Sequence, residues 1–189
     1  MTCAILAGGQ SKRMGRDKAT VEINRKALIN LIYDKAKEVF HDIIIISNNH
    51  KIIEGIEAPI MPDIIPVRSP SVGIASALTY ADTPYVFILA CDMPFISVEA
   101  LRYMVNEVNG EDIIIPRTKG GLEPLHAIYN RSCMAPLFRL IEQNRLKIMD
   151  VLPYVRVREL GQEPCFIKDG ASVFTNINTM NDLEMAEAL

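Results

Sequence analysis

Short apolar runs alternate along the chain with longer stretches in which apolar residues recur every three or four positions. The short runs are rich in Ile and Val and are apolar at consecutive positions, as is typical of parallel strands buried on both faces. Strands are predicted at Cys3–Ala7, Asp42–Ser47, Pro59–Met61, Tyr85–Ala90 and Asp112–Pro116. Their alternation with helical patterns predicts an α/β sheet with right-handed crossovers.

Two of the longer stretches have clear helical spacing. Apolar residues recur in this way over 28–40 and over 101–108, and Ser97 precedes the second stretch as a candidate N-cap. The second half of the chain is less regular. It contains a turn at 119–121, an apolar segment at 125–129, a helix around 134–143, and a capping box formed by Thr179 and Asp182 that predicts a C-terminal helix.

Composition indicates a folded globular protein. The chain has 189 residues with no internal repeat or low-complexity linker, so we expect a single domain. About 49% of the residues are apolar and 23% are charged, which excludes a disordered chain. With 20 basic and 23 acidic residues the net charge is −3, so no overall positive field favours nucleic acid or an anionic membrane.

The N-terminal residues predict a soluble, cytoplasmic protein. They lack a basic segment and reach glycine too soon for a secretory signal, and no apolar run approaches the ~18 residues needed to cross a bilayer. The four cysteines are far apart and form no C-x-x-C pair. That spacing favours reduced, structural thiols over a zinc site or a disulfide framework.

The loop after the first strand is rich in glycine and in basic residues. Its three glycines allow a ligand to approach the backbone closely. Four of the chain's 20 basic residues lie within it: Lys12, Arg13, Arg16 and Lys18. The spacing matches neither a Walker A loop nor G-x-G-x-x-G. A solvated surface turn is the alternative, but the position after the first strand favours binding of a phosphorylated ligand.

A second loop begins where the strand ending at Ala90 meets Cys91-Asp92-Met93-Pro94. Ligands of open α/β sheets bind beyond the carboxyl ends of the parallel strands, so Asp92 would face the glycine-rich loop. A carboxylate there can hold Mg²⁺, which takes its other ligands from phosphate and water. The alternative is an Asx turn that leads into the next helix.

Other polar residues are less decisive. Asn48 and Asn49 can present amides to a base or a ribose, although a local turn is favoured. Asp63 either accepts hydrogen bonds from a guanine edge or only fixes its own loop. His126 lies in an apolar stretch, so a hydrogen-bonded core histidine is favoured over a catalyst.

Together these loops resemble those of the molybdenum cofactor guanylyltransferase family, also called MobA-type proteins. Residues 6–18 match, at every specified position, the signature L-A-G-G-x-S-x-R-M-G-x-D-K that the family shares with other nucleotidyltransferases. The resemblance continues in C-D-M-P-F at 91–95, P-L-H-A-I-Y at 124–129 and N-I-N-T at 176–179. It departs in the central loop at 69–74, where S-P-S-V-G-I stands in place of G-P-L-x-G-I.

The resemblance implies a nucleotide-diphospho-sugar-transferase-like fold, with a Rossmann-like, mostly parallel sheet flanked by helices. It implies a nucleotide-binding half at 1–116 and an acceptor-binding half at 117–189. The backbone of the first loop would hold the nucleotide, with further contacts nearby. The residues implied for nucleotide binding are Leu6, Ala7, Gly8, Gly9, Lys18, Asn49, Asp63 and Asp92, with Lys18 on the phosphates. Arg13, Lys18 and Asp92 are the implied catalytic residues, and Asp92 is the implied Mg²⁺ ligand.

The implied reaction moves GMP from GTP to molybdopterin-bound molybdenum cofactor and releases pyrophosphate. A phosphate monoester is already ionised near pH 7, so its attack needs no strong general base. The implied partners are cofactor-delivery proteins and acceptor molybdoenzymes, without nucleic acid or membrane. The alternatives are a cytidylyl or sugar-phosphate nucleotidyltransferase with the same loop, and a nucleotide-binding regulatory module without turnover.

Overall fold

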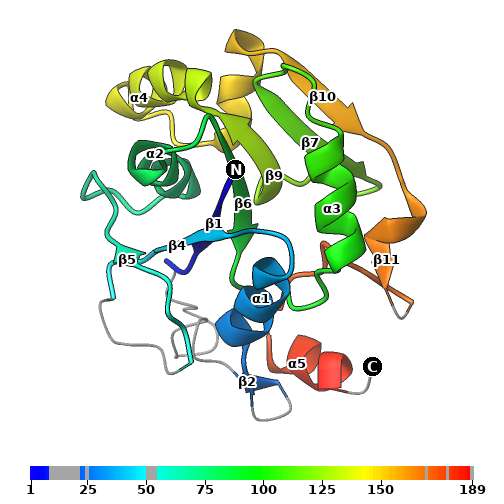
Figure 1. Ribbon diagram of the computed structural model, residues 1–189. Coiled ribbons are helices and arrows are strands. Elements are labelled where there is room, and N and C mark those ends of the chain that lie inside the picture. The colour runs from blue at the N-terminus through cyan, green and yellow to red at the C-terminus, as the bar shows by residue number, and fades with distance from the viewer. Residues whose placement is uncertain (9–21, 24–25, 50–54, 169, 178, 188–189) are drawn as a thin grey trace.

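The structure is a computed structural model that describes residues 1–8, 22–23, 26–49, 55–168, 170–177 and 179–187. A central sheet carries helices on both faces (Figure 1). In spatial order its strands are β10 (Val157–Leu160), β7 (Ile113–Thr118), β9 (His126–Asn130), β6 (Tyr85–Ala90), β1 (Thr2–Leu6), β4 (Asp42–Ile46) and β5 (Ile60–Met61), with β8 (Gly121–Leu122) beside β7.

Most neighbouring strands run parallel. β1 pairs in parallel with β4 and β6, β4 with β5, and β7 with β10. β9 is antiparallel to both β6 and β7. The mostly parallel α/β sheet predicted from the sequence is therefore confirmed, and the predicted strands agree with the observed ones to within two residues at each end.

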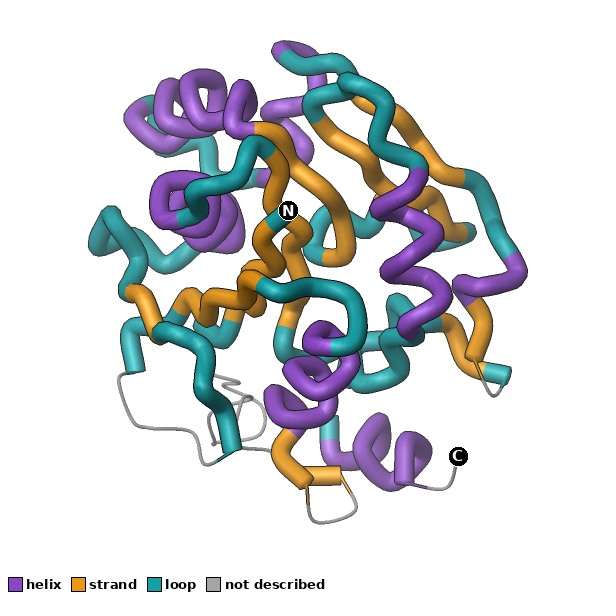
Figure 2. The backbone as a smooth tube through the Cα atoms, viewed as in Figure 1, coloured by secondary structure: helices purple, strands orange, loops and turns teal. Residues whose placement is uncertain are grey.

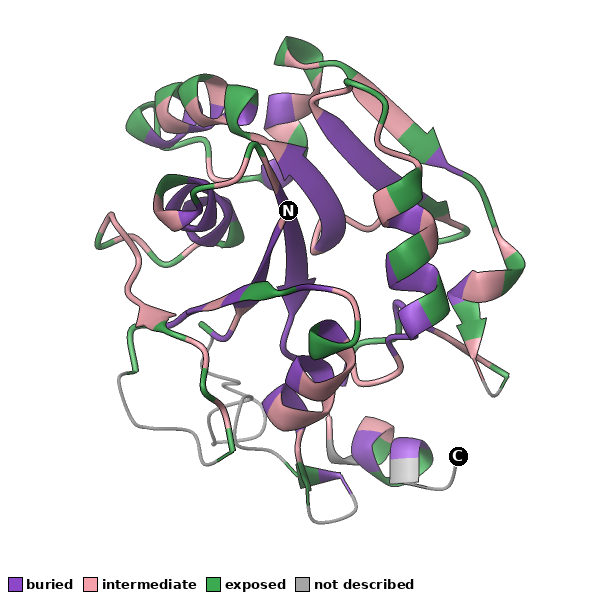
Figure 3. Cartoon of the chain, viewed as in Figure 1, coloured by how far each residue is buried: buried purple, intermediate pink, exposed green. Residues whose placement is uncertain are grey.

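Each face of the sheet has its own apolar core, because alternate strand residues point to opposite sides. Ile5 belongs to the cluster under α1 (Leu28–Lys37) and α3 (Val98–Asn106). The next residue toward the N-terminus, Ala4, belongs to the cluster under α2 (Pro70–Tyr80) and α4 (Met134–Glu142). Figure 2 shows the strands between these helices, and Figure 3 shows that β1, β6 and β9 are almost entirely buried.

The capping residues predicted for two helices are confirmed. The Oγ of Ser97 accepts a hydrogen bond from the Ala100 N–H at 3.0 Å and begins α3. The Thr179 N–H donates to Asp182 Oδ2 at 2.8 Å, and the Asp182 N–H donates to Thr179 Oγ1 at 3.1 Å. This capping box begins the C-terminal helix α5 (Met180–Glu187).

The sequence led us to expect a loop at 69–74, but this segment forms the start of α2. Ser69 is the N-cap, its Oγ accepts a hydrogen bond from the Ser71 N–H at 3.2 Å, and Pro70 is the first helical residue. Residues 71–78 are all buried, because α2 packs against both β6 and α4. A helix covered on all sides has no polar face, so it lacks the spacing by which amphipathic helices are recognised.

Smaller elements complete the described part of the chain. Two hairpins pair β2 (Glu22–Ile23) with β3 (Lys26–Ala27), and β11 (Ile167–Lys168) with β12 (Ala171–Ser172). Short 3-10 helices occupy Arg131–Cys133, Ile148–Tyr154 and Pro164–Phe166. Across the described ranges, which include all four cysteines, there is no disulfide. None of the helices described is long and apolar enough to cross a membrane.

Candidate active site

The loops with predicted chemistry leave the sheet at a common edge. Leu6 pairs with Ile46 on one side and with Ala90 on the other, so β1, β4 and β6 end at the same level. The ladder continues one residue further. The Ala7 N–H donates to the Ile46 carbonyl at 2.9 Å, and the Cys91 N–H donates to the Leu6 carbonyl at 3.2 Å. Ligands of open α/β sheets bind at such an edge.

The structure places the start of the predicted nucleotide-binding loop. Leu6 is partly buried and Ala7 is buried, whereas Gly8 is exposed. A Cβ atom added at Gly8 would meet no atom within 4 Å, so this backbone is open to a ligand. The rest of the loop lies outside the described residues, and so do three predicted site residues: Gly9, Arg13 and Lys18.

Asn49 follows β4 next to the first loop. The hydroxyl of buried Ser47 lies 3.4 Å from the Ala7 carbonyl oxygen and accepts a hydrogen bond from the Asn49 N–H at 3.1 Å. Ser47 therefore ties the end of β4 to the start of the glycine-rich loop. The exposed Asn49 stands at the same edge as Gly8, where the sequence placed it.

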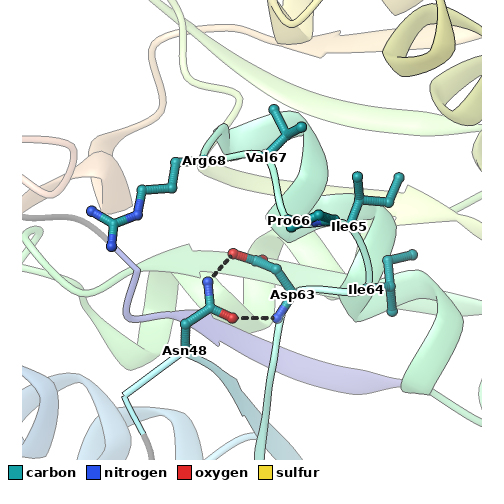
Figure 4. Close-up of a pocket in the computed structure, with 7 residues that line it drawn as sticks. All are labelled: Asn48, Asp63, Ile64, Ile65, Pro66, Val67 and Arg68. Carbon is teal, nitrogen blue, oxygen red and sulfur yellow. Dashed lines mark hydrogen bonds between the residues drawn. The ribbon is translucent and has the colours of Figure 1, made fainter.

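A reciprocal pair of hydrogen bonds joins Asn48 to Asp63, which lies 15 residues later in the chain (Figure 4). Asn48 Nδ2 donates to Asp63 Oδ2 at 2.8 Å, and the Asp63 N–H donates to Asn48 Oδ1 at 2.9 Å. Ser76 of α2 holds the next residue, since its Oγ accepts from the Ile64 N–H at 3.0 Å. Desolvation raises the pKa of the Asp63 carboxyl, and the hydrogen bond from Asn48 opposes that rise. Asp63 thus helps to fix its own loop, and recognition of a guanine edge by its carboxylate stays a prediction.

A cavity of about 360 Å³ opens beside this pair. Its walls are Asn48, Asp63, Ile64, Ile65, Pro66, Val67 and Arg68. Four of these residues are apolar and three are polar or charged, and such a mixture of apolar walls and convergent polar groups suits a small molecule. Sequence reasoning missed two features of this cavity. The hydrogen bonds between Asn48 and Asp63 join positions 15 residues apart, and Arg68 belongs to no recognised motif.

Asp92 stands partly exposed just beyond the end of β6. Its backbone carbonyl accepts a hydrogen bond from the Ile177 N–H at 2.8 Å. The C-terminal segment 170–177 therefore reaches the edge that carries the glycine-rich loop. The edge brings together the described members of the predicted site: Leu6, Ala7, Gly8, Asn49, Asp63 and Asp92.

His126 is buried in β9 as predicted, but the prediction that it is hydrogen-bonded was wrong. Its ring has no exposed surface, and neither ring nitrogen has a hydrogen-bond partner among the residues described. The ring packs edge-on against Phe87 and Phe174, at centroid distances of 5.5 and 5.0 Å. Burial lowers the pKa of the imidazole to about 3, so the ring is neutral at pH 7.

Known proteins resemble this chain along its whole length. The sequence profile of the MobA-like NTP transferase domain matches residues 3–156. The chain belongs to the MobA-like NTP transferase family. It is 35% identical, over 189 residues, to a probable molybdenum cofactor guanylyltransferase of Pelotomaculum thermopropionicum, and the match covers 100% of this chain and 92% of the relative. The protein is therefore a nucleotidyltransferase by family.

Further relatives extend the match. A molybdenum cofactor guanylyltransferase of Desulfosudis oleivorans is 35% identical over 191 residues, which cover 100% of this chain and 95% of that one. Among solved structures, the molybdopterin-guanine dinucleotide biosynthesis protein A of Archaeoglobus fulgidus has a TM-score of 0.85 at 30% identity, and the match covers 100% of this chain and 97% of that one. The 4-diphosphocytidyl-2C-methyl-D-erythritol synthase of Anaerococcus prevotii has a TM-score of 0.72 at 14% identity, covering 99% and 96%, which shows the shared fold alone.

Proposed function

We propose that this protein transfers GMP from GTP to the molybdopterin form of the molybdenum cofactor, with release of pyrophosphate and formation of a guanine dinucleotide cofactor. The observation that carries the proposal is 35% identity across the whole chain to proteins named molybdenum cofactor guanylyltransferase. That match extends beyond residue 156, so it includes the segment whose Ile177 N–H reaches the Asp92 carbonyl.

The nucleotide binds along the edge formed by β1, β4 and β6. Its phosphates lie against the backbone amides of the first loop, from Leu6 through Gly9, and Lys18 adds a compact positive charge. The nucleoside lies toward Asn49 and Asp63. The cavity beside Asp63 supports this placement, because its apolar walls suit the faces of a flat base.

The reaction forms a bond from an oxygen of the acceptor phosphate to the α-phosphorus of GTP. It breaks the bond from that phosphorus to the oxygen that bridges the α- and β-phosphates, and pyrophosphate leaves with the electron pair. The acceptor monoester already carries negative charge near pH 7, so no side chain must remove a proton. The protein must align the acceptor phosphate with the α-phosphorus and neutralise the charge of the phosphates, and we assign these roles to Arg13 and Lys18.

Mg²⁺ fits the chemistry of this edge. Asp92 offers carboxylate oxygens, which this cation prefers, and Mg²⁺ needs few protein ligands when a triphosphate and water supply the others. In the part of the chain that is described, no three His, Cys, Asp or Glu side chains gather around one point, so a site here relies on Asp92 with nucleotide and water. When bound, the ion neutralises charge on the phosphates.

The acceptor binds on the 117–189 half, which contributes the segment 170–177 to the edge. This role also predicts protein partners that deliver the cofactor or receive the product, and a cytoplasmic location. These stay predictions.

A panel of triphosphates tests the proposal. GTP, ATP, CTP and UTP are each incubated with the protein, Mg²⁺ and molybdenum cofactor, and pyrophosphate release is measured. We expect release with GTP and only in the presence of the cofactor. Release with CTP, or with a sugar phosphate as acceptor, would identify the alternative transferases, and GTP binding without release would identify a regulatory module.

Replacement of Asp63 tests where the base is recognised. Guanine offers donors at N1 and N2 that a carboxylate accepts, and loss of one such partner leaves a desolvated polar group that costs ~1–3 kcal/mol. We expect Asp63→Ala to reduce the preference for GTP over ATP in kcat/KM, whereas the exposed Asp82→Ala serves as a matched control. An undiminished preference would move recognition to the backbone at 6–8 or 47–49.

A further inference from the structure

The loop after Asp63 carries a cation to which the proposed reaction has assigned no role. Arg68 lines the same cavity as Asp63 and is exposed. Its side chain extends from the loop toward the side on which the Asn48 amide lies (Figure 4). Within the described ranges it forms no hydrogen bond or ion pair. The planar fork of guanidinium donors is therefore available to a ligand of the cavity.

The backbone on both sides of Arg68 is held in place. The Val67 N–H donates to the Ile65 carbonyl at 2.8 Å. Ser69 caps α2, and its Oγ donates to the Leu146 carbonyl at 3.0 Å. The other end of the loop is fixed by the reciprocal Asn48 pair described above. A loop ordered before binding loses little conformational entropy when a ligand arrives, which favours specific recognition.

The two charged groups of this loop differ in what they can recognise. Asp63 accepts hydrogen bonds, whereas Arg68 donates them in a fixed planar geometry. The residues between them present apolar walls. Guanine carries partners for both groups, because it has donors at N1 and N2 and acceptors at O6 and N7. Arginine binds that O6 and N7 pair with two parallel hydrogen bonds when it reads guanine in nucleic acids.

We propose that Arg68 is a specificity residue, donating a forked pair of hydrogen bonds to O6 and N7 of guanine while Asp63 accepts from N1 and N2. This inference rests on the proposed function, since it names the group that distinguishes GTP from other triphosphates. Adenine would bring its 6-amino donor against the guanidinium donors, and cytosine has no N7.

The test compares kcat/KM for GTP, 7-deaza-GTP, which lacks N7, and ITP, which lacks the 2-amino group. The variants are Arg68→Ala and Arg68→Lys, with Arg139→Ala as a matched control. Arg139 is also exposed, and its side chain also has no hydrogen bond or ion pair with the residues described. We expect Arg68→Ala to lose roughly 10- to 100-fold with GTP and much less with 7-deaza-GTP.

Two ratios decide the outcome. In Arg68→Ala the ratio of GTP to 7-deaza-GTP should fall toward one, while the ratio of GTP to ITP, which depends on Asp63, is unchanged. Arg68→Lys keeps the charge but cannot span both acceptors, so it should not restore the first ratio. In a protein whose unmutated form turns over GTP, an equal loss with all three nucleotides, an unchanged ratio, or full rescue by lysine would overturn the inference about Arg68. Absence of GTP turnover in the unmutated protein would refute the proposed function itself.

Discussion

Replacing His126 with Phe tests whether the buried imidazole ring in β9 makes the fold sensitive to acid. The pKa of this imidazole falls from the usual 6.5 to about 3 on folding, because burial disfavours the charged form. Between those values the unfolded chain binds more protons than the folded chain. Stability is therefore lost as pH falls below 6.5, at about 1.4 kcal/mol per pH unit, which amounts to about 2 kcal/mol between pH 7 and pH 5.

The Phe variant removes this proton linkage and keeps a flat ring between Phe87 and Phe174. It also removes two buried polar atoms without partners among the described residues, whose burial costs ~1–3 kcal/mol. The larger ring adds a packing cost of similar size, ~1–3 kcal/mol, so stability at pH 7 should change little. The packing cost does not depend on pH, so the pH dependence isolates the effect of the imidazole.

Urea unfolding of both proteins, followed by circular dichroism at pH 7, 6 and 5, gives the measurement. The unfolding free energy of the unmutated protein minus that of His126→Phe should fall by about 2 kcal/mol from pH 7 to pH 5. Effects of carboxyl groups cancel in this difference. His41→Gln, at an exposed position, controls for loss of a histidine elsewhere. A difference constant to within about 0.5 kcal/mol would show that the folded ring accepts a proton as readily as the unfolded one, so that burial does not lower the pKa of His126.

Other consequences concern the edge of the sheet. Lys18→Ala should weaken GTP binding and slow turnover by about 100-fold, because it removes a positive charge from the phosphates; steady-state kinetics with circular dichroism of the fold check this. Asp92→Asn keeps the shape of the carboxylate but should abolish Mg²⁺-dependent transfer while GTP still binds, as Mg²⁺ titrations of activity and calorimetry would show. Gly73→Ala would place a Cβ 3.3 Å from a Leu6 methyl group and should raise the KM for GTP by displacing Leu6, whereas Gly161→Ala, with open space around it, should not. In the Gly73→Ala variant the close contact with Leu6 destabilises the fold, but alanine stabilises the helix by about 1 kcal/mol relative to glycine. The thermal midpoint of this variant should therefore stay close to that of the unmutated protein.

The strands could be predicted because the physics that forms them is local. A parallel strand buried on both faces must be apolar at consecutive positions, as β6 is, and Ser97 and Thr179 cap helices through hydrogen bonds within three residues. Helix α2 was missed because burial on all sides erases the polar face on which helix recognition depends.

The site was predictable only in part. Residues that directly follow strands, such as Asp92 and Asn49, could be placed because parallel strands end at one edge. The bonds between Asn48 and Asp63 could not, because they join two loops brought together by the pairing of β4 with β5. For the same reason the surroundings of His126 could not be predicted, since the aromatic residues that pack against its ring come from β6 and from the segment 170–177.

Transfer of labelled phosphate is the most direct test of guanylyl transfer. GTP labelled at the α-phosphorus, or separately at the γ-phosphorus, is incubated with the protein, Mg²⁺ and molybdenum cofactor, and the products are separated. We expect the α-label to enter a molybdopterin product together with guanine, and the γ-label to leave in pyrophosphate. Label from the γ-position in the product, or α-label transferred equally well from ATP or CTP, would contradict guanylyl transfer.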